Sequence, residues 1–201
     1  MISNLEFQEI YALLLSKFCH DITSPINALS LIFELLETHN LKEIDMAKQS
    51  CQDIFDILAF YKILFLCNKF DAFDKVVKYF KNICKKKNIQ FSNNIIDTES
   101  VSEELSKIFL CVFFIFLSKN KQIKSIFIEK NQKGTVFSIF SDSPEILKKF
   151  KTIEFNKKKE NELNSKLAIN LFLQKLLEKE NYQIITIYEK DVLKLIIDKN
   201  I

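Results

Sequence analysis

The first part of the chain carries apolar residues at alternating steps of four and three, which is typical of a helix that packs against other helices. The series is Tyr11, Leu15, Phe18, Ile22, Pro25, Leu29, Ile32 and Leu36. After a short polar break at 38–40, a second series of the same kind follows, with Ile44, Ala47, Cys51, Ile54, Leu58, Tyr61 and Phe65. The two series predict an antiparallel helical hairpin. Two copies packed as a four-helix bundle, a symmetric homodimer, would cover both apolar seams.

The pattern changes near residue 70, so we predict two domains, 1–69 and 70–201. The second domain is expected to contain helices near 71–86, 101–118 and 163–179, and strands near 88–92, 123–129, 135–141, 182–188 and 192–198. A polar, lysine-rich stretch over 142–162 precedes the last helix, and the only glycine, Gly134, lies in the predicted turn 131–134. This order predicts an α+β fold in which helices cover one face of a mostly antiparallel sheet.

Composition narrows the class of protein. With 201 residues, 48% hydrophobic and 27% charged, the chain is typical of a globular protein with a sizeable core. Its longest apolar run, 108–117, is too short to cross a bilayer, and no charged leader opens the chain, so we expect a cytoplasmic protein without membrane contact. The net charge of +3 and lysine clusters without interleaved aromatic residues favour solvated surfaces over nucleic-acid binding.

The five cysteines are scattered without paired spacing, so neither a disulfide framework nor a zinc site is predicted. Cys51 and Cys111 fall on apolar faces, and we expect both to fill the core.

His20 stands out because its place on the first helix is wrong for a core residue. At about 100° per residue it lies roughly opposite Phe18 and Ile22, so it should face solvent. The small or hydrogen-bonding side chains Ser16, Lys17, Ser24 and Asn27 are expected on the same outward stripe. The other histidine, His39, falls in the loop between the helices, where a plain turn residue is the simpler interpretation.

The segment around His20, with Asp21, Ser24 and Pro25 after it, resembles the H-box of two-component histidine kinases and phosphotransferases. The resemblance is closest to the ChpT-type histidine phosphotransferases of alphaproteobacteria and extends over most of the chain. Residues 15–28 are similar to that family's L-C-H-D-x-x-x-P-x-x-A segment, and residues 58–65 are similar to its F-Y-R-x-A-F stretch. Lys62 replaces the arginine there, which exchanges a bidentate phosphate contact for a point charge.

The resemblance implies a dimerisation hairpin that carries the phosphoacceptor, His20, followed by a degenerate kinase ATPase-like domain. Such a protein accepts phosphoryl from the receiver domain of a hybrid histidine kinase and passes it to response regulators. It needs no cofactor of its own, because Mg²⁺ is supplied in the receiver. Asp21 would steer the histidine tautomer or repel a stray anion, Lys17 would help to neutralise the phosphoryl group, and small neighbours would leave room for the receiver. The alternatives are a plain solvated carboxylate at Asp21, an ordinary surface lysine at Lys17 and small polar residues that only make the helix soluble.

The residues independently disfavour a nucleotide site. Kinase ATP sites use glycine-rich loops that let the backbone approach phosphates, and this chain has one glycine, already assigned to a turn. Histidine suits relay chemistry, since a neutral imidazole with an ordinary pKa of about 6.5 is a nucleophile near neutral pH. Two other functions stay open at this point: an ATP-dependent histidine kinase with an eroded catalytic domain, and a non-catalytic dimeric adaptor.

Overall fold

A computed structural model describes most of the chain. The described residues are 7–35, 41–66, 72–95, 98, 101–119, 123–131, 134–141, 168–189 and 192–199. The predicted interhelical loop with His39, the polar stretch 142–162 and the first residues of the last predicted helix lie outside this part of the chain.

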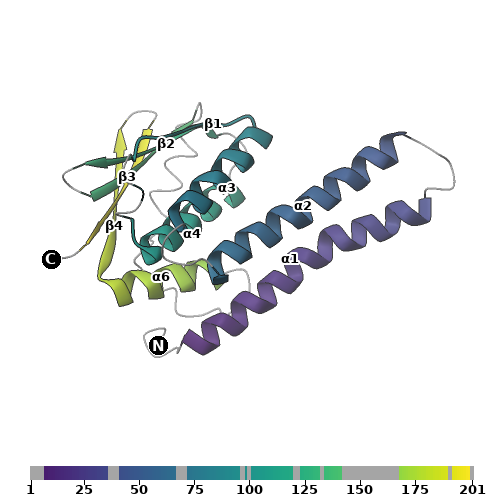
Figure 1. The fold of residues 1–201 in the computed structure, drawn as a ribbon, viewed down its shortest axis with the longest axis horizontal. Coiled ribbons are helices and arrows are strands. Elements are labelled where there is room, and N and C mark those ends of the chain that lie inside the picture. Colours follow the sequence, from purple (N-terminus) through teal and green to yellow (C-terminus); the bar gives the residue numbers. More distant parts are fainter. Residues whose placement is uncertain are drawn as a thin grey trace.

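The N-terminal region is a pair of long helices. Helix α1 (Phe7–Leu35) and helix α2 (Leu41–Leu66) lie side by side and antiparallel, and they project away from the rest of the molecule (Figure 1). Helix α1 continues across Pro25. The predicted helical hairpin is therefore confirmed. Among the described helices, none combines the length and hydropathy that a bilayer span requires.

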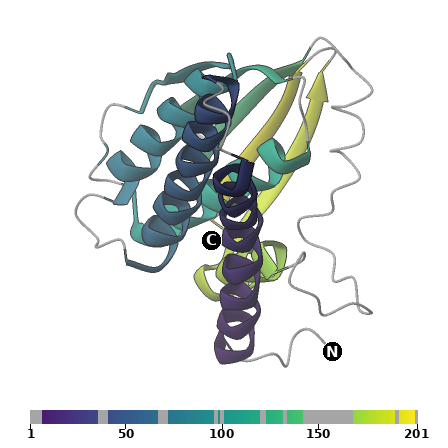
Figure 2. The ribbon, with the colours of Figure 1, turned by 90° about the vertical axis from the view of Figure 1, so that its right-hand side faces the viewer.

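The second region is a helix-and-sheet sandwich. Its elements are α3 (Ala72–Lys86), β1 (Gln90–Asn93), α4 (Glu103–Lys119), β2 (Ile123–Asn131), β3 (Gly134–Ser141), α6 (Ala168–Glu180), β4 (Tyr182–Glu189) and β5 (Val192–Lys199). The strand order is β1-β2-β3-β5-β4, with β1 and β2 parallel and the other pairs antiparallel. The three helices of this region lie on one face of the sheet (Figures 1 and 2). The predicted α+β class, element order and mostly antiparallel sheet are confirmed.

Asparagine and serine residues mark several element ends. Asn88 and Asn181 adopt left-handed backbone conformations, with φ of 55° and 56°, where α3 and α6 end before a strand. Asparagine tolerates this conformation better than most residues, so it can end a helix in a chain almost without glycine. Ser102 begins α4, since its Oγ accepts a hydrogen bond from the backbone N–H of Leu105 at 3.1 Å.

Gly134 is required by the β2–β3 hairpin. Its φ is +123°, and a Cβ at this position would lie 2.5 Å from the carbonyl oxygen of Ile197 on β5. Only a residue without a side chain fits against the neighbouring strand at this point. The prediction that the single glycine serves the hairpin is thus confirmed.

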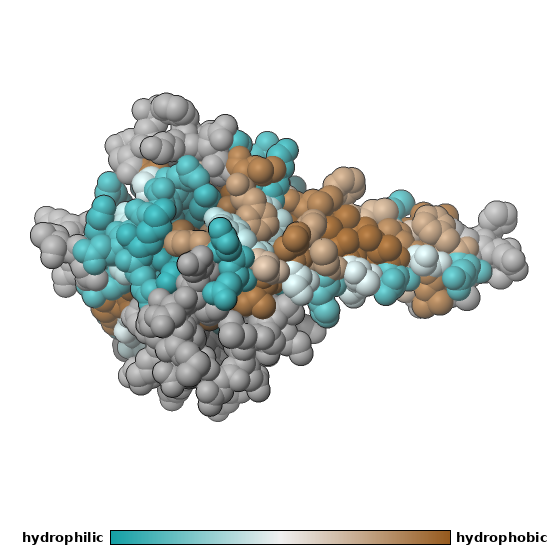
Figure 3. Space-filling view, turned by 90° about the horizontal axis from the view of Figure 1, so that it is seen from below, coloured by the Kyte–Doolittle hydropathy of each residue, from teal (hydrophilic) through white to brown (hydrophobic). Residues whose placement is uncertain are grey.

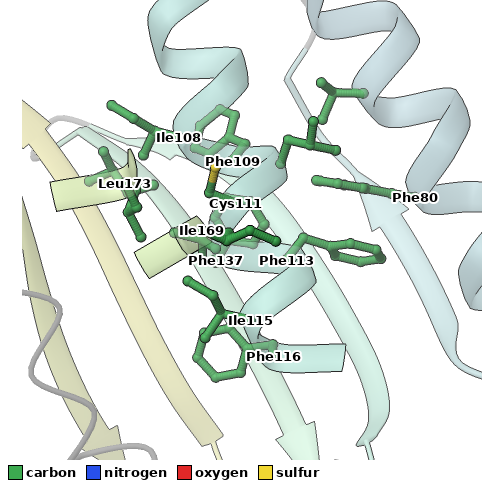
Figure 4. Packing of buried hydrophobic residues seen from close by; sticks show 14 of the residues in the cluster. Phe80, Ile108, Phe109, Cys111, Phe113, Ile115, Phe116, Phe137, Ile169 and Leu173 are labelled. Carbon is green, nitrogen blue, oxygen red and sulfur yellow. The ribbon is translucent and has the colours of Figure 1, made fainter. Parts of the chain in front are cut away.

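The core lies between the sheet and α4 (Figure 4). Helix α4 is buried along most of its length, which explains why its sequence is apolar on every side. The rings of Phe80 on α3 and Phe113 on α4 stack with centroids 3.8 Å apart. Cys111 is fully buried among these side chains, as predicted.

The base of the hairpin belongs to the same core. Ile10 and Leu14 of α1, and Phe60 and Leu64 of α2, are buried within the hydrophobic cluster that continues into the second region. The hairpin is therefore anchored on the sandwich, and the two regions together determine the surroundings of His20.

The predicted apolar seams divide into two stripes. Ile32 and Tyr61 are buried within the chain, whereas the outer faces of α1 and α2 leave large apolar side chains in solvent. The exposed fractions are 43% for Tyr11, 57% for Leu15, 47% for Ile26, 64% for Phe33, 40% for Ile44, 65% for Phe55 and 42% for Leu58. We call these seven residues the outer stripe. Apolar side chains gather along the projecting hairpin in Figure 3.

One prediction about the cysteines is wrong. Cys51 does not fill the core of the chain, because its side chain is exposed. It lies on α2 seven residues after Ile44 and seven before Leu58, which places it on the face of the outer stripe. Its apolar sequence context reflected an exposed apolar face rather than burial.

Candidate functional site

His20 lies on α1 with 73% of its side chain exposed. The predicted outward orientation is confirmed. The Nδ1 atom of the ring lies 3.5 Å from Oδ1 of Asp21, the next residue. Nε2, on the far side of the ring from Nδ1, is the nitrogen left for a reaction partner.

Asp21 differs sharply from its neighbour, because only 18% of its side chain is exposed. Both of its carboxylate oxygens have partners. Lys17, one turn earlier on α1, donates to Oδ1 at 2.9 Å, and the hydroxyl of Tyr61 on α2 donates to Oδ2 at 3.3 Å. The carboxylate is thus held between the two helices of the hairpin.

Tyr61 is a buried residue, with 3% of its surface exposed. Its ring lies 4.9 Å from that of Phe18, 5.0 Å from that of Phe60 and 5.8 Å from that of Phe65, measured between centroids. Burial, with a further contribution from the Asp21 charge, raises the pKa of Tyr61 far above its ordinary value. The hydroxyl therefore keeps its proton and acts as a donor to Asp21.

Lys17 corrects one of the predictions from sequence. It was expected on the outward stripe with His20, but only 16% of its side chain is exposed. Besides its ion pair with Asp21, its ammonium group lies 6.0 Å from the ring centroid of Phe114 on α4. A position three residues before His20 is rotated by about 60° around the helix, and this rotation is enough to turn Lys17 towards the second region.

A groove of about 760 Å³ lies beside His20, between the hairpin and helices α3, α4 and α6. Four of the predicted site residues line it: His20, Asp21, Lys17 and Ser24. The other three do not. Ser16 and Asn27 are exposed elsewhere on α1, and Lys62 is exposed on α2.

The far wall of the groove comes from the second region. Phe60 on α2 and Phe114 on α4 meet with ring centroids 4.4 Å apart. Asp56 on α2 pairs with Lys86 on α3, with Nζ–O distances of 2.5 and 2.6 Å to the two carboxylate oxygens. Both contacts connect the hairpin to the sandwich, and Phe60, Phe114 and Asp56 line the groove. Among the described residues, no group of three or more histidine, cysteine or acidic side chains is arranged to hold a metal ion.

Sequence reasoning missed the roles of Tyr61 and Phe114 around His20. The sequence places Tyr61 in the apolar seam of α2. A tyrosine at such a position predicts a hydrogen-bond partner, because a buried tyrosine hydroxyl usually requires one. No sequence signal connects Phe114 with Lys17, because their contact depends on how α4 lies against α1.

Comparisons with known proteins find likeness in structure but none in sequence. No protein-family model matches the chain, and no curated protein matches it in sequence. Among solved structures, one described as a bacterial phosphotransferase aligns with a TM-score of 0.76 and 18% identity over 97% of this chain and 98% of its own. The catalytic domain of the histidine kinase ThkA aligns with a TM-score of 0.40 and 16% identity over 62% of this chain and 86% of its own. The Acinetobacter baumannii histidine kinase AdeS aligns with a TM-score of 0.38 and 10% identity over 90% of this chain and 98% of its own.

The first likeness covers both chains almost completely. It shows that this chain has the fold of that bacterial phosphotransferase, with the helical hairpin and the sandwich in the same overall arrangement. The fold implied by the resemblance to histidine phosphotransferases is therefore confirmed.

Proposed function

We propose that the chain is a histidine phosphotransferase of a two-component phosphorelay, with His20 as the phosphoacceptor. One observation carries the proposal: an exposed imidazole lies beside a partnered carboxylate, on a hairpin whose fold matches a bacterial phosphotransferase from end to end. The site thus combines an exposed imidazole with a half-buried, hydrogen-bonded carboxylate on the next residue.

The proposed reaction uses the accessible Nε2 of His20. The Nε2 lone pair of His20 attacks the phosphorus atom of an aspartyl phosphate on a receiver domain. An N–P bond forms, and the P–O bond to the receiver breaks, leaving its electron pair on the aspartate. The ring keeps its Nδ1 proton and gains positive charge, which the Asp21 carboxylate stabilises. The reverse reaction passes phosphoryl to the aspartate of another receiver.

The partners in this proposal are the receiver domain of a hybrid histidine kinase and one or more response regulators. Mg²⁺ belongs to the receiver's own site. Ser16, Ser24 and Asn27 are exposed on α1 on the two sides of His20, and they leave room for a receiver surface. Lys62 has no proposed contact with phosphoryl, because it does not line the groove beside His20.

We also propose a homodimer in which the outer stripe closes a four-helix bundle. Seven large apolar side chains in solvent along two adjacent helices are costly for an isolated chain. Successive members lie 4, 11 and 7 residues apart on α1 and 11 and 3 residues apart on α2, and these separations keep them on one helix face, as in the seam of a helical bundle. A second copy of the same hairpin provides the complementary face.

The second region is proposed to lack a nucleotide site. Gly134 is needed by the β2–β3 hairpin, so the chain has no further glycine for a phosphate loop. Helix α4 contains no asparagine, the residue that holds Mg²⁺ in kinase ATP sites, and most of its side chains are buried.

Phosphotransfer profiling tests the proposal. Each phosphorylated receiver of the cell would be mixed with the wild type, with His20→Ala and with His39→Ala as the matched control. We expect label on the wild type and on His39→Ala only. Label on His20→Ala would contradict the site, and absence of label from every receiver would favour the adaptor function. Labelling of the chain by ATP alone would favour the kinase.

A further inference from the structure

The hydroxyl of Tyr61 lies at the end of a short chain of contacts that reaches His20. It donates to Oδ2 of Asp21 at 3.3 Å, while Lys17 donates to Oδ1 at 2.9 Å. That same Oδ1 lies 3.5 Å from Nδ1 of His20. A carboxylate held at both oxygens has a defined plane, and here its Oδ1 side lies towards the imidazole.

We infer that Tyr61 is a positioning residue for His20: together with Lys17 it holds Asp21 so that the imidazole proton stays on Nδ1 and Nε2 is free to accept phosphoryl. The inference rests on the proposed function for its catalytic consequence, but the tautomer can be observed without any phosphotransfer.

The carboxylate can act on the proton because of where it lies. At 3.5 Å the contact is electrostatic rather than a full hydrogen bond, and it favours the proton on the nearer nitrogen. The partner of one imidazole nitrogen decides which nitrogen carries the proton. A carboxylate that fixes the tautomer of a histidine is an established arrangement in catalytic triads.

Tyr61 is suited to this role by its surroundings. Its ring is fixed by the rings of Phe18 on α1 and of Phe60 and Phe65 on α2, so the hydroxyl has little freedom to move. Burial raises its pKa and keeps the hydroxyl protonated near neutral pH, where it remains a donor. Phe60 also contacts Phe114 on α4, so the packing around Tyr61 includes the second region.

The experiment is ¹⁵N NMR of the protein labelled at histidine, which contains only two imidazoles. The wild type would be compared with Tyr61→Phe, which keeps the buried ring and removes only the hydroxyl. Tyr11→Phe is the matched control, since it removes a tyrosine hydroxyl from the same helix as His20 at a position outside the groove. His39→Ala assigns the two sets of signals.

We expect the neutral His20 of the wild type and of Tyr11→Phe to carry its proton on Nδ1. In Tyr61→Phe and Asp21→Asn the population should shift towards the Nε2–H form. Phosphoryl uptake by Tyr61→Phe should be slower by about three- to tenfold, the effect of losing one hydrogen bond in the site.

Two results would overturn the inference: a wild-type His20 that carries its proton on Nε2, or a Tyr61→Phe spectrum identical to that of the wild type. These outcomes are separate from a failure of the proposed function. If no receiver labels His20 but the tautomer responds to Tyr61, the positioning stands and the phosphotransfer proposal fails.

Discussion

At the residue scale, the contrast between His20 and Asp21 defines the site. They are adjacent in sequence, yet 73% of one side chain is exposed and only 18% of the other. A step of about 100° around a helix accounts for the difference, because it turns the imidazole outwards and the carboxylate towards α2. The accessible side chain and the restrained side chain thus belong to consecutive residues. The exposed ring can reach a partner protein, and the half-buried carboxylate keeps its position.

Burial predicts a clear difference in reactivity among the cysteines. The pKa of Cys84 is raised by burial to about 12, and that of Cys111 is raised by burial as well. The thiolate is the reactive form, so we expect both to resist alkylation at pH 8, whereas exposed Cys19 reacts. Mass spectrometry of peptides after brief treatment with N-ethylmaleimide checks this. Denatured protein, in which every cysteine should react, is the control, and native labelling of Cys84 as fast as Cys19 would contradict the burial.

At the scale of elements, the two hairpin helices each carry two apolar stripes of different use. The inner stripe, with Ile10, Leu14 and Phe60, anchors the hairpin on the sandwich, while the outer stripe remains in solvent. One helix face therefore serves folding of the chain, and the other is available for a second chain.

A charge on the outer stripe should separate the dimer without unfolding the chain. Leu58 is 42% exposed in the single chain, so Leu58→Glu leaves the monomer intact. In a closed bundle the same carboxylate would be buried without a partner. This should reduce the free energy of dimerisation by about 3 kcal/mol or more. Light scattering should give a dimer for the wild type and a monomer for the variant, with unchanged circular dichroism. Ile185→Glu, at a similarly exposed residue on β4, should remain dimeric. A monomeric wild type at micromolar concentration would contradict the assembly.

Cys51 offers an independent measure of the same interface. It is exposed in the single chain and lies on the face of the outer stripe. We expect its alkylation to be slow in the dimeric wild type and in dimeric Ile185→Glu, and fast in Leu58→Glu. Equal rates in the wild type and Leu58→Glu would place the interface elsewhere.

At the scale of the whole molecule, the hairpin and the sandwich behave as one structure, because a single hydrophobic cluster runs through both. Phe60 lies where they join, with 1% of its surface exposed and its ring 4.4 Å from that of Phe114. The ion pair of Asp56 with Lys86 adds a polar contact across the same junction. The second region thus has a structural role beside His20.

Removing Phe60 should therefore destabilise the whole chain. Phe60→Ala leaves a cavity between the regions, and we expect a loss of about 3–5 kcal/mol in the free energy of unfolding. Phe55→Ala, on the exposed side of the same helix, is the matched control and should cost the monomer less than about 1 kcal/mol. Urea unfolding, measured in the Leu58→Glu background to exclude dimerisation, gives both values. Similar losses in the two variants would contradict the role assigned to Phe60.

Stability should also fall at alkaline pH. Cys84 has a folded pKa of about 12 against an ordinary value of 9.0, so the folded state retains its proton more tightly than the unfolded state. The stabilisation is complete below about pH 9 and is lost as pH rises towards 12, with a slope of up to about 1.4 kcal/mol per pH unit. Buried Tyr61 and Cys111 and partly buried Tyr79 act in the same direction. Urea unfolding between pH 7 and 11 should show this decline, and Cys84→Ala should show a shallower one.

Much of this protein could be predicted from sequence because the signals are local and periodic. Heptad spacing predicted the pair of long helices, strand patterns and the single glycine predicted the pairing of β2 with β3, and the helical position of His20 predicted its exposure. Helices and strands can be predicted in this way because their geometry repeats every few residues and so produces a periodic pattern of apolar positions.

What only the tertiary structure decided are the contacts between elements distant in sequence. Tyr61 contacts Asp21 across 40 positions, and Lys17 contacts Phe114 across 97 positions (114 − 17). Residue spacing in the sequence therefore predicts neither contact. The same holds for Cys51, whose apolar context looked identical whether its face covered the core or remained in solvent. Periodicity determines which side chains share a face, but the packing of whole helices against each other determines what that face meets.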